Sequence, residues 1–104
     1  MTEISLLTRV AFSHIANDVV AEMRRQVEVE GYTPEHDDAH PFGELARAGA
    51  AYALYQTFAM TSREELGLWP WSEPLKPKPT RRSLEVAAAL ICREIARLDR
   101  VGKE

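Results

Sequence analysis

The sequence predicts an all-α fold: a small bundle of three main helices, with short helical turns and a proline-rich crossover between them. Two long segments, about 3–30 and 80–101, carry apolar residues at the three- and four-residue steps of one helix face. A third segment, about 42–58, is dense in small residues, and four prolines lie within the following residues 68–80. Because the chain has only 104 residues, we expect residues 1–104 to form a single helical domain.

Composition and charge limit the classes of protein that fit this chain. A content of 45% hydrophobic and 28% charged residues is ordinary for a globular chain and argues against disorder. The single cysteine, Cys92, excludes an intramolecular disulfide and fits a reducing compartment. The sequence shows neither a signal peptide nor a membrane-spanning apolar run, so we expect a cytoplasmic protein without membrane partners. A net charge of -3 disfavours sequence-specific binding of nucleic acid.

The first long segment predicts a helix whose apolar surface is wider than one stripe. We therefore expect it to be covered on two sides, for which a homodimer or higher oligomer is one means. On another face, His14, Asp18 and Glu22 follow at four-residue steps, which suits either a divalent cation or a solvated polar face. The main stripe is Phe12, Ile15, Ala16, Val19, Met23 and Val27, and the surface is widened by Ile4, Leu7, Val10, Ala11 and Val20.

Residues 31–44 form an acidic stretch with ligand-type side chains. Thr33, Pro34 and Glu35 are a helix-start signature, and Pro41 limits the predicted turn to residues 33–40. The turn concentrates a set of candidate ligands for Mn²⁺ or Mg²⁺. The alternative is structural, with the carboxylates bonding backbone amides or arginines while the imidazoles pack or cap. The candidate metal ligands are His36, Asp37, Asp38 and His40.

The middle of the chain predicts a helix followed by an extended crossover. Small residues in the 42–58 helix allow another helix to approach closely, and Thr61 and Ser62 predict a short helical turn that ends at Gly67. The prolines of 68–80 favour an extended, semi-rigid connection. Trp69 and Trp71 within it either close over the core or form the wall of a groove.

The last predicted helix, about 80–101, begins with an unusual charge pattern. We expect Thr80 to cap it and an apolar stripe of Leu84, Ala87, Ala88, Ile91, Ile95 and Leu98 to face the core. Its first turn carries cations at the positive end of the helix dipole, an arrangement that is costly unless an anion is bound there. That anion is either a phosphate or the protein's own patch of Glu35, Asp37 and Asp38. The cations are Lys76, Lys78, Arg81 and Arg82, whereas Arg93, Arg97 and Arg100 are interpreted as ordinary solvated charges.

Five short motifs stand out between about Arg24 and Arg100. They are Glu30-Gly31-Tyr32-Thr33-Pro34-Glu35-His36-Asp37-Asp38, Gly43-Glu44-Leu45-Ala46, Trp69-Pro70-Trp71, Lys76-Pro77-Lys78, and Ala89-Leu90-Ile91 with Arg97-Leu98-Asp99-Arg100. In these motifs the chain resembles a family of small bacteriophage and prophage proteins, whereas the first helix matches less well. The resemblance implies a setting, an accessory protein in the cytoplasm of an infected bacterial host, and by analogy a role in counter-defence or host takeover.

Three functions are compatible with these residues. The favoured one is a non-enzymatic, oligomeric binder of an anionic small molecule such as a nucleotide signal. The second is a metal-dependent hydrolase of nucleotides or phosphoesters that uses the candidate metal ligands. The third is an inhibitor of a host defence protein or other host enzyme, acting through the acidic patch or the tryptophan segment. For the binder, the phosphate-binding candidates are Lys76, Lys78, Arg81 and Arg82, and the base-stacking candidates are Trp69, Trp71 and Tyr32.

Overall fold

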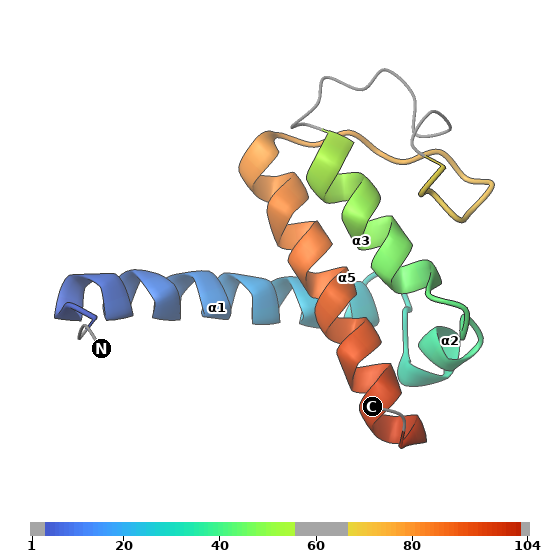
Figure 1. Cartoon of the computed structure of the whole chain (residues 1–104), viewed down its shortest axis with the longest axis horizontal. Helices are drawn as coiled ribbons and strands as arrows, with labels where there is room; N and C mark the ends of the chain where they lie inside the picture. Colours follow the sequence, from blue (N-terminus) through green and yellow to red (C-terminus); the bar gives the residue numbers. More distant parts are fainter. Residues whose placement is uncertain (1–3, 56–66, 103–104) are drawn as a thin grey trace.

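The computed structural model describes residues 4–55 and 67–102, and within these ranges the regular elements are all α-helices. They are α1 (Leu6–Glu28), α2 (Pro34–Asp38), α3 (Glu44–Tyr55) and α5 (Thr80–Val101). The predicted all-α class is confirmed. α3 and α5 lie side by side, whereas α1 meets α5 near the C-terminal end of α1 and projects away from the rest (Figure 1). The predicted turn at 61–67, apart from Gly67 itself, and the end of the predicted 42–58 helix lie outside the described residues.

Side-chain caps explain where the first two helices begin. The Thr8 amide donates a hydrogen bond to the Ser5 hydroxyl at 3.2 Å, which satisfies an amide that has no partner within the helix. The His36 amide donates in the same way to the Thr33 hydroxyl, also at 3.2 Å. Pro34 takes the first position of α2, where a missing amide costs nothing. The short helix predicted from the threonine and proline is therefore present.

The start of α5 differs from the prediction by one residue. Thr80 is the first helical residue rather than the cap, and Pro79 holds the cap position without a side-chain hydrogen bond. Because the ring of Pro79 fixes its backbone φ angle, the crossover stays extended up to the first residue of α5. The Pro79 carbonyl then accepts a hydrogen bond from the Ser83 amide at 2.8 Å. The Ser83 hydroxyl also donates to the Lys78 carbonyl at 3.2 Å, so the end of the crossover is tied to the first turn of α5.

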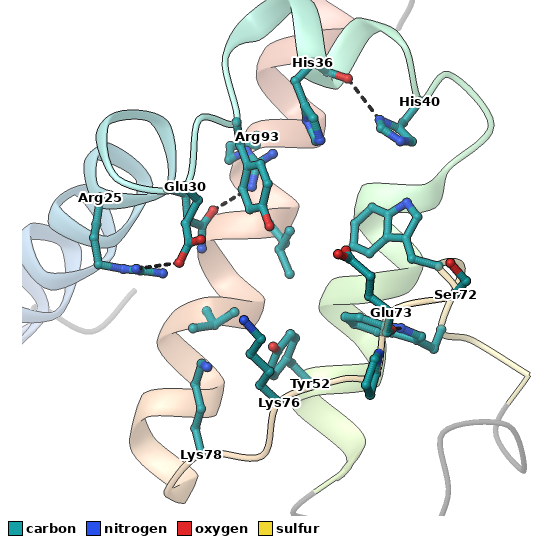
Figure 2. A pocket seen from close by; sticks show the side chains of 17 residues that line it. Arg25, Glu30, His36, His40, Tyr52, Ser72, Glu73, Lys76, Lys78 and Arg93 are labelled. Atoms are coloured by element: carbon teal, nitrogen blue, oxygen red, sulfur yellow. Dashed lines mark hydrogen bonds and ion pairs between the residues drawn. The ribbon is translucent and has the colours of Figure 1, made fainter.

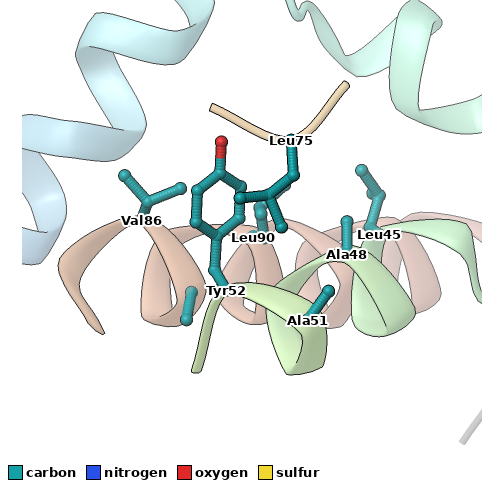
Figure 3. Packing of buried hydrophobic residues seen from close by; sticks show 8 residues of the cluster. Leu45, Ala48, Ala51, Tyr52, Leu75, Val86 and Leu90 are labelled. Carbon is teal, nitrogen blue, oxygen red and sulfur yellow. The ribbon is translucent and has the colours of Figure 1, made fainter. Parts of the chain in front are cut away.

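The hydrophobic core lies between α3, α5 and the crossover (Figure 3). The predicted close approach of α3 to another helix is confirmed at Gly49, where an added Cβ would lie 3.0 Å from the Ala87 carbonyl oxygen. Leu75 reaches the core from the crossover, which places this proline-rich segment over the helix pair. The buried core residues are Leu45, Ala48, Ala51 and Tyr52 of α3, Val86, Ala87 and Leu90 of α5, and Leu75.

α5 buries only part of the apolar stripe predicted for it, since Ala87 is in the core while other members of the stripe are exposed. Leu84, Ile91 and Ile95 are 42 to 54% exposed, whereas Arg93 and Arg97 are 4% and 6% exposed. The interpretation of these two arginines as solvated charges was wrong, because each is paired with a carboxylate of the chain. For Arg97 the partner is Glu94, with Nε and Oε1 2.8 Å apart. Paired charges are tolerated in an interior far better than single ones, so they do not prevent burial of this face.

α1 leaves most of its apolar surface uncovered within one chain. Its buried residues are Glu22 and Gln26, close to its C-terminal end. Over the first turns of α1, the predicted stripe is largely exposed within the described part of the chain. No helix in the described ranges is long and apolar enough to span a membrane. The exposed large apolar side chains on and just before α1 include Ile4, Leu6, Leu7, Val10, Phe12, Ile15 and Val20.

Candidate functional site

A cavity of about 570 Å³ opens between the C-terminal end of α1, α2, α3, α5 and the crossover (Figure 2). Small-molecule sites in proteins typically have volumes of about 300 to 1,000 Å³, so this cavity is large enough for a ligand of that class. Four of the five sequence motifs contribute to its lining, through Tyr32 and His36, through Trp69 and Trp71, through Lys76 and Lys78, and through Leu90. The further lining residues are Arg25, Gln26, Glu30, His40, Tyr52, Ser72, Glu73, Pro74, Val86 and Arg93.

One side of the cavity is a continuous series of aromatic rings, which we call the ring wall. Consecutive ring centroids lie 4.7, 4.7, 5.7, 5.3 and 5.7 Å apart, distances at which aromatic rings contact each other. The first pair is stacked and the last three are edge-to-face, so the wall has both ring faces and ring edges. In spatial order the ring wall consists of Tyr32, His36, His40, Trp71, Trp69 and Tyr52.

The two imidazoles of the ring wall are held in fixed orientations by the α2 turn. His40 Nδ1 lies 2.9 Å from the His36 carbonyl oxygen, and since a carbonyl only accepts, this nitrogen carries the proton. His36 Nδ1 likewise lies 3.0 Å from an oxygen of the Asp37 carboxylate. The neutral form of each ring then has an unprotonated Nε2, to which no group in the described part of the chain is bonded. Both rings can therefore accept a hydrogen bond from a ligand.

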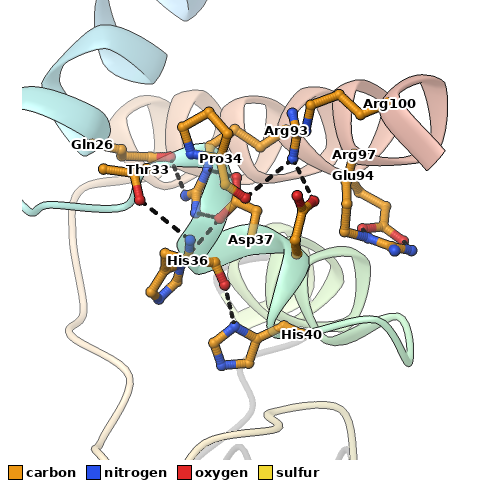
Figure 4. A network of polar contacts seen from close by, with 11 residues as sticks. Gln26, Thr33, Pro34, His36, Asp37, His40, Arg93, Glu94, Arg97 and Arg100 are labelled. Atoms are coloured by element: carbon orange, nitrogen blue, oxygen red, sulfur yellow. Dashed lines mark hydrogen bonds and ion pairs between the residues drawn. The ribbon is translucent and has the colours of Figure 1, made fainter.

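A buried ionic network anchors the α2 turn to α5 (Figure 4). Arg93 donates from Nε to Asp37 at 3.0 Å and from Nη1 to the Gln26 side-chain oxygen at 2.7 Å. Asp37 and Arg93 are 3% and 4% exposed, and the guanidinium also lies over the Tyr32 ring, 5.0 Å from its centroid. At the surface, Arg100 pairs with Asp38 at 2.8 Å. The acidic stretch is thus neutralised by arginines of α5 that sequence analysis had left as solvated charges.

The ion pairs of Asp37 and Asp38 involve two of the four candidate metal ligands. In residues 4–55 and 67–102, no group of three or more His, Cys, Asp or Glu side chains is placed to hold a metal ion. Of the four candidates, Asp37 and Asp38 are bonded to arginines, and His36 and His40 contribute their rings to the cavity. These contacts agree with the structural alternative for this turn. In that alternative the acids pair with arginines and the histidines pack.

Cations also line the cavity, and two of them, Lys78 and Arg93, lie over the terminal rings of the ring wall. Burial lowers the pKa of the Lys78 ammonium below its ordinary value, and the nearby charges of Arg82, Arg25 and Lys76 lower it further. The ammonium also lies 5.7 Å from the centroid of the Tyr52 ring. Burial raises the pKa of the Tyr52 phenol, against a backbone hydrogen bond from Lys76. The lowered pKa of Lys78 reflects burial first and neighbouring cations second, and an anion beside this lysine would offset both effects.

Arg81 and Arg82 are not among the residues that line the cavity, although the sequence grouped them with Lys76 and Lys78. Arg81 pairs with Asp18 at 2.9 Å, and Arg82 pairs with Glu22 at 2.7 Å. Both arginines also pair with Glu85 of α5 itself. The anions at the start of α5 are therefore carboxylates of α1 and α5, neither of the two occupants that the sequence suggested. The same contacts explain the polar line on α1, since two of its three members hold arginines of α5.

The structure also adds lining residues that sequence reasoning had not selected. Tyr52 of α3 closes the ring wall beside Trp69. Glu73 lies two residues after the second tryptophan, and the Trp69 indole N–H donates to its carbonyl at 2.6 Å. The indole Nε1 of Trp71 is buried and has no hydrogen-bond partner within the described residues. Glu73 could have been predicted as a lining residue from its position close to the two tryptophans in the sequence.

Fold and cavity together define a helical protein with a pocket that is lined by aromatic rings and by cations. Comparisons with protein-family models, with curated proteins and with solved structures found no match for the chain. The resemblance to bacteriophage and prophage proteins therefore stays a prediction, and the functional argument rests on the cavity.

Proposed function

We propose that this chain is a non-enzymatic binder of an anionic small molecule with an aromatic ring system, such as a nucleotide. The observation that carries the proposal is that the ring wall and the cations of Lys76 and Lys78 line the same cavity. Nucleobases stack on aromatic side chains, and phosphate oxygens bind ammonium and guanidinium groups, so the two kinds of lining group match the two halves of a nucleotide.

The charge balance of the cavity favours an anion at the lysine end. Arg93 is engaged by Asp37 and Gln26, and Arg25 is engaged by Glu22 at 2.9 Å and Glu30 at 2.8 Å. Lys76 and Lys78 line the same cavity as these two guanidinium groups. A phosphate bound beside Lys78 would be attracted by these cations, and it would raise the lowered pKa of Lys78 toward its ordinary value.

Binding fits the contacts better than metal-assisted hydrolysis. The two carboxylates nearest the imidazoles, Asp37 and Asp38, already form ion pairs with Arg93 and Arg100. Phosphate mimicry by the acidic patch, the basis of the inhibitor hypothesis, is disfavoured by the same pairs. The tryptophan segment is part of the ring wall, and its rings contact each other and Tyr52.

We further propose that the protein acts as a homodimer or higher oligomer assembled through α1. Exposed apolar residues continue along this helix well beyond its contact with α5. A large apolar surface of this kind is typical of protein interfaces. The resemblance to phage and prophage proteins would place such an oligomer in an infected cell, where capture of a nucleotide signal would serve counter-defence.

Isothermal titration with nucleoside monophosphates and with pyrophosphate tests the binding proposal. We expect measurable binding of both, and Lys78→Ala should weaken it about tenfold through loss of a charged contact. Arg81→Ala is the matched control, because this cation lies outside the cavity and should leave the affinity unchanged. Absence of any nucleotide or pyrophosphate binding by the unaltered protein would refute the proposal.

A further inference from the structure

We infer that Glu73 selects the base, and that the preferred ligand is a guanine nucleotide. The inference rests on the proposed function, because it names the class of nucleotide that the same cavity takes. Its starting observation is that a carboxylate lines a cavity that cations also line. An acid in such a place repels phosphate and attracts hydrogen-bond donors, so it fixes which end of a nucleotide lies there.

Glu73 is available to a ligand in a way that the other lining carboxylate is not. Glu30 is held by Arg25, with Nη1 and Oε2 2.8 Å apart. Within the described residues no donor is bonded to the carboxylate of Glu73, and its backbone is fixed by the hydrogen bond from the Trp69 indole. Figure 2 shows the Glu73 side chain directed toward the cavity, on the side opposite Lys78. The Glu73 carboxylate and the Lys78 ammonium are therefore separated within the cavity (Figure 2).

Base chemistry then decides which nucleotide fits. The Watson–Crick edge of guanine has a ring N–H beside an amino group, two adjacent donors that suit the two oxygens of one carboxylate. Adenine and cytosine have an amino group beside an unprotonated ring nitrogen, whose lone pair would face the second oxygen. Uracil has one ring N–H between two carbonyl oxygens, which a carboxylate repels. Guanine is the base that offers a donor to each oxygen of Glu73.

The positions of the remaining groups agree with this orientation. A guanine whose edge faces Glu73 lies beside the ring wall, on which it can stack, since Trp69 and Trp71 closely precede this residue in sequence and line the same cavity. Its phosphate then points away from the acid and toward Lys76 and Lys78. The reverse orientation would place phosphate against the carboxylate and leave the amino group among cations.

Affinities for GMP and IMP provide the test, because IMP differs from GMP only by lacking the amino group. We expect the unaltered protein to bind GMP about tenfold more tightly than IMP, the loss expected for one charge-assisted hydrogen bond. Glu73→Gln should reduce this preference below about threefold while pyrophosphate binding persists. Glu28→Gln is the matched control, since this exposed acid of α1 lies outside the cavity, and it should keep the full preference.

The outcomes separate the inference from the proposed function. Equal binding of GMP and IMP, or a preference that survives Glu73→Gln, overturns the role of Glu73 and leaves nucleotide binding intact. If GMP, IMP and pyrophosphate all fail to bind, the proposed function is wrong and the inference falls with it. A preference for GMP that Glu73→Gln removes and Glu28→Gln retains supports both.

Discussion

Replacing Asp37 with asparagine tests whether the buried pair with Arg93 holds the cavity wall in place. Both side chains are 5% exposed, so the substitution leaves a guanidinium buried without its counter-charge. Breaking a buried ion pair in this way typically costs about 3 to 5 kcal/mol. A domain of this size is commonly stable by only about 5 to 15 kcal/mol, so we expect Asp37→Asn to remove a large share of the free energy of unfolding.

The neighbouring acid provides the matched control. Asp38 pairs with Arg100 at the surface, where the two side chains are 45% and 35% exposed. Exposed pairs contribute about 0 to 1 kcal/mol, so Asp38→Asn should be nearly silent. Urea denaturation followed by circular dichroism, at one protein concentration, measures both variants. Equal losses for the two substitutions, or a loss below about 1 kcal/mol for Asp37→Asn, would refute this account of the anchor.

Three further predictions follow from packing, charge and exposure. Gly49→Ala should lower the free energy of unfolding by about 1 to 3 kcal/mol in urea denaturation, because its Cβ would lie 3.0 Å from the Ala87 carbonyl oxygen; no loss would mean that α3 and α5 separate easily. Pyrophosphate affinity should fall as pH rises through the lowered pKa of Lys78, because the cation is lost there, and Lys78→Arg should remove this pH dependence in titrations from neutral pH upward. Glutamate at both Phe12 and Ile15 should lower the molar mass measured by light scattering if α1 is the interface, and an unchanged oligomer would exclude that role.

Local chemistry made much of the fold predictable. Thr33 and Pro34 predicted the start of a short helix, which is present. The small residues of α3 predicted a close helix pair, and the crossover prolines predicted an extended segment; the structure has both. Each of these effects acts over a few residues. The site was predictable only in part. Trp69 and Trp71 were predictable because two large apolar side chains in a proline-rich segment are expected to pack over the core or form the wall of a groove. Both line the cavity.

The buried charges were not predictable by the same means. Arg93 follows the spacing of an ordinary solvated face, and its partner Asp37 lies 56 residues earlier in the chain. Nothing within one turn of either residue indicates the other, because their proximity depends on how α2 docks against α5. The same limit applied to the pairs that Arg81 and Arg82 form with α1, although their further partner Glu85 lies within one turn. Charge patterns identify groups that need a counter-ion, whereas tertiary packing decides which one they receive.

The projecting part of α1 has a consequence for the order in which the protein folds. Residues 6–17 make up about 18 Å of helix at 1.5 Å per residue, and nearly all of their side chains are exposed. Helices shorter than about 12 to 15 residues are marginal in water on their own. Residues 6–17 should therefore fray when the protein is dilute and become helical when chains associate. Amide hydrogens of these turns would then exchange at rates that depend on protein concentration, while those of α3 and α5 would not.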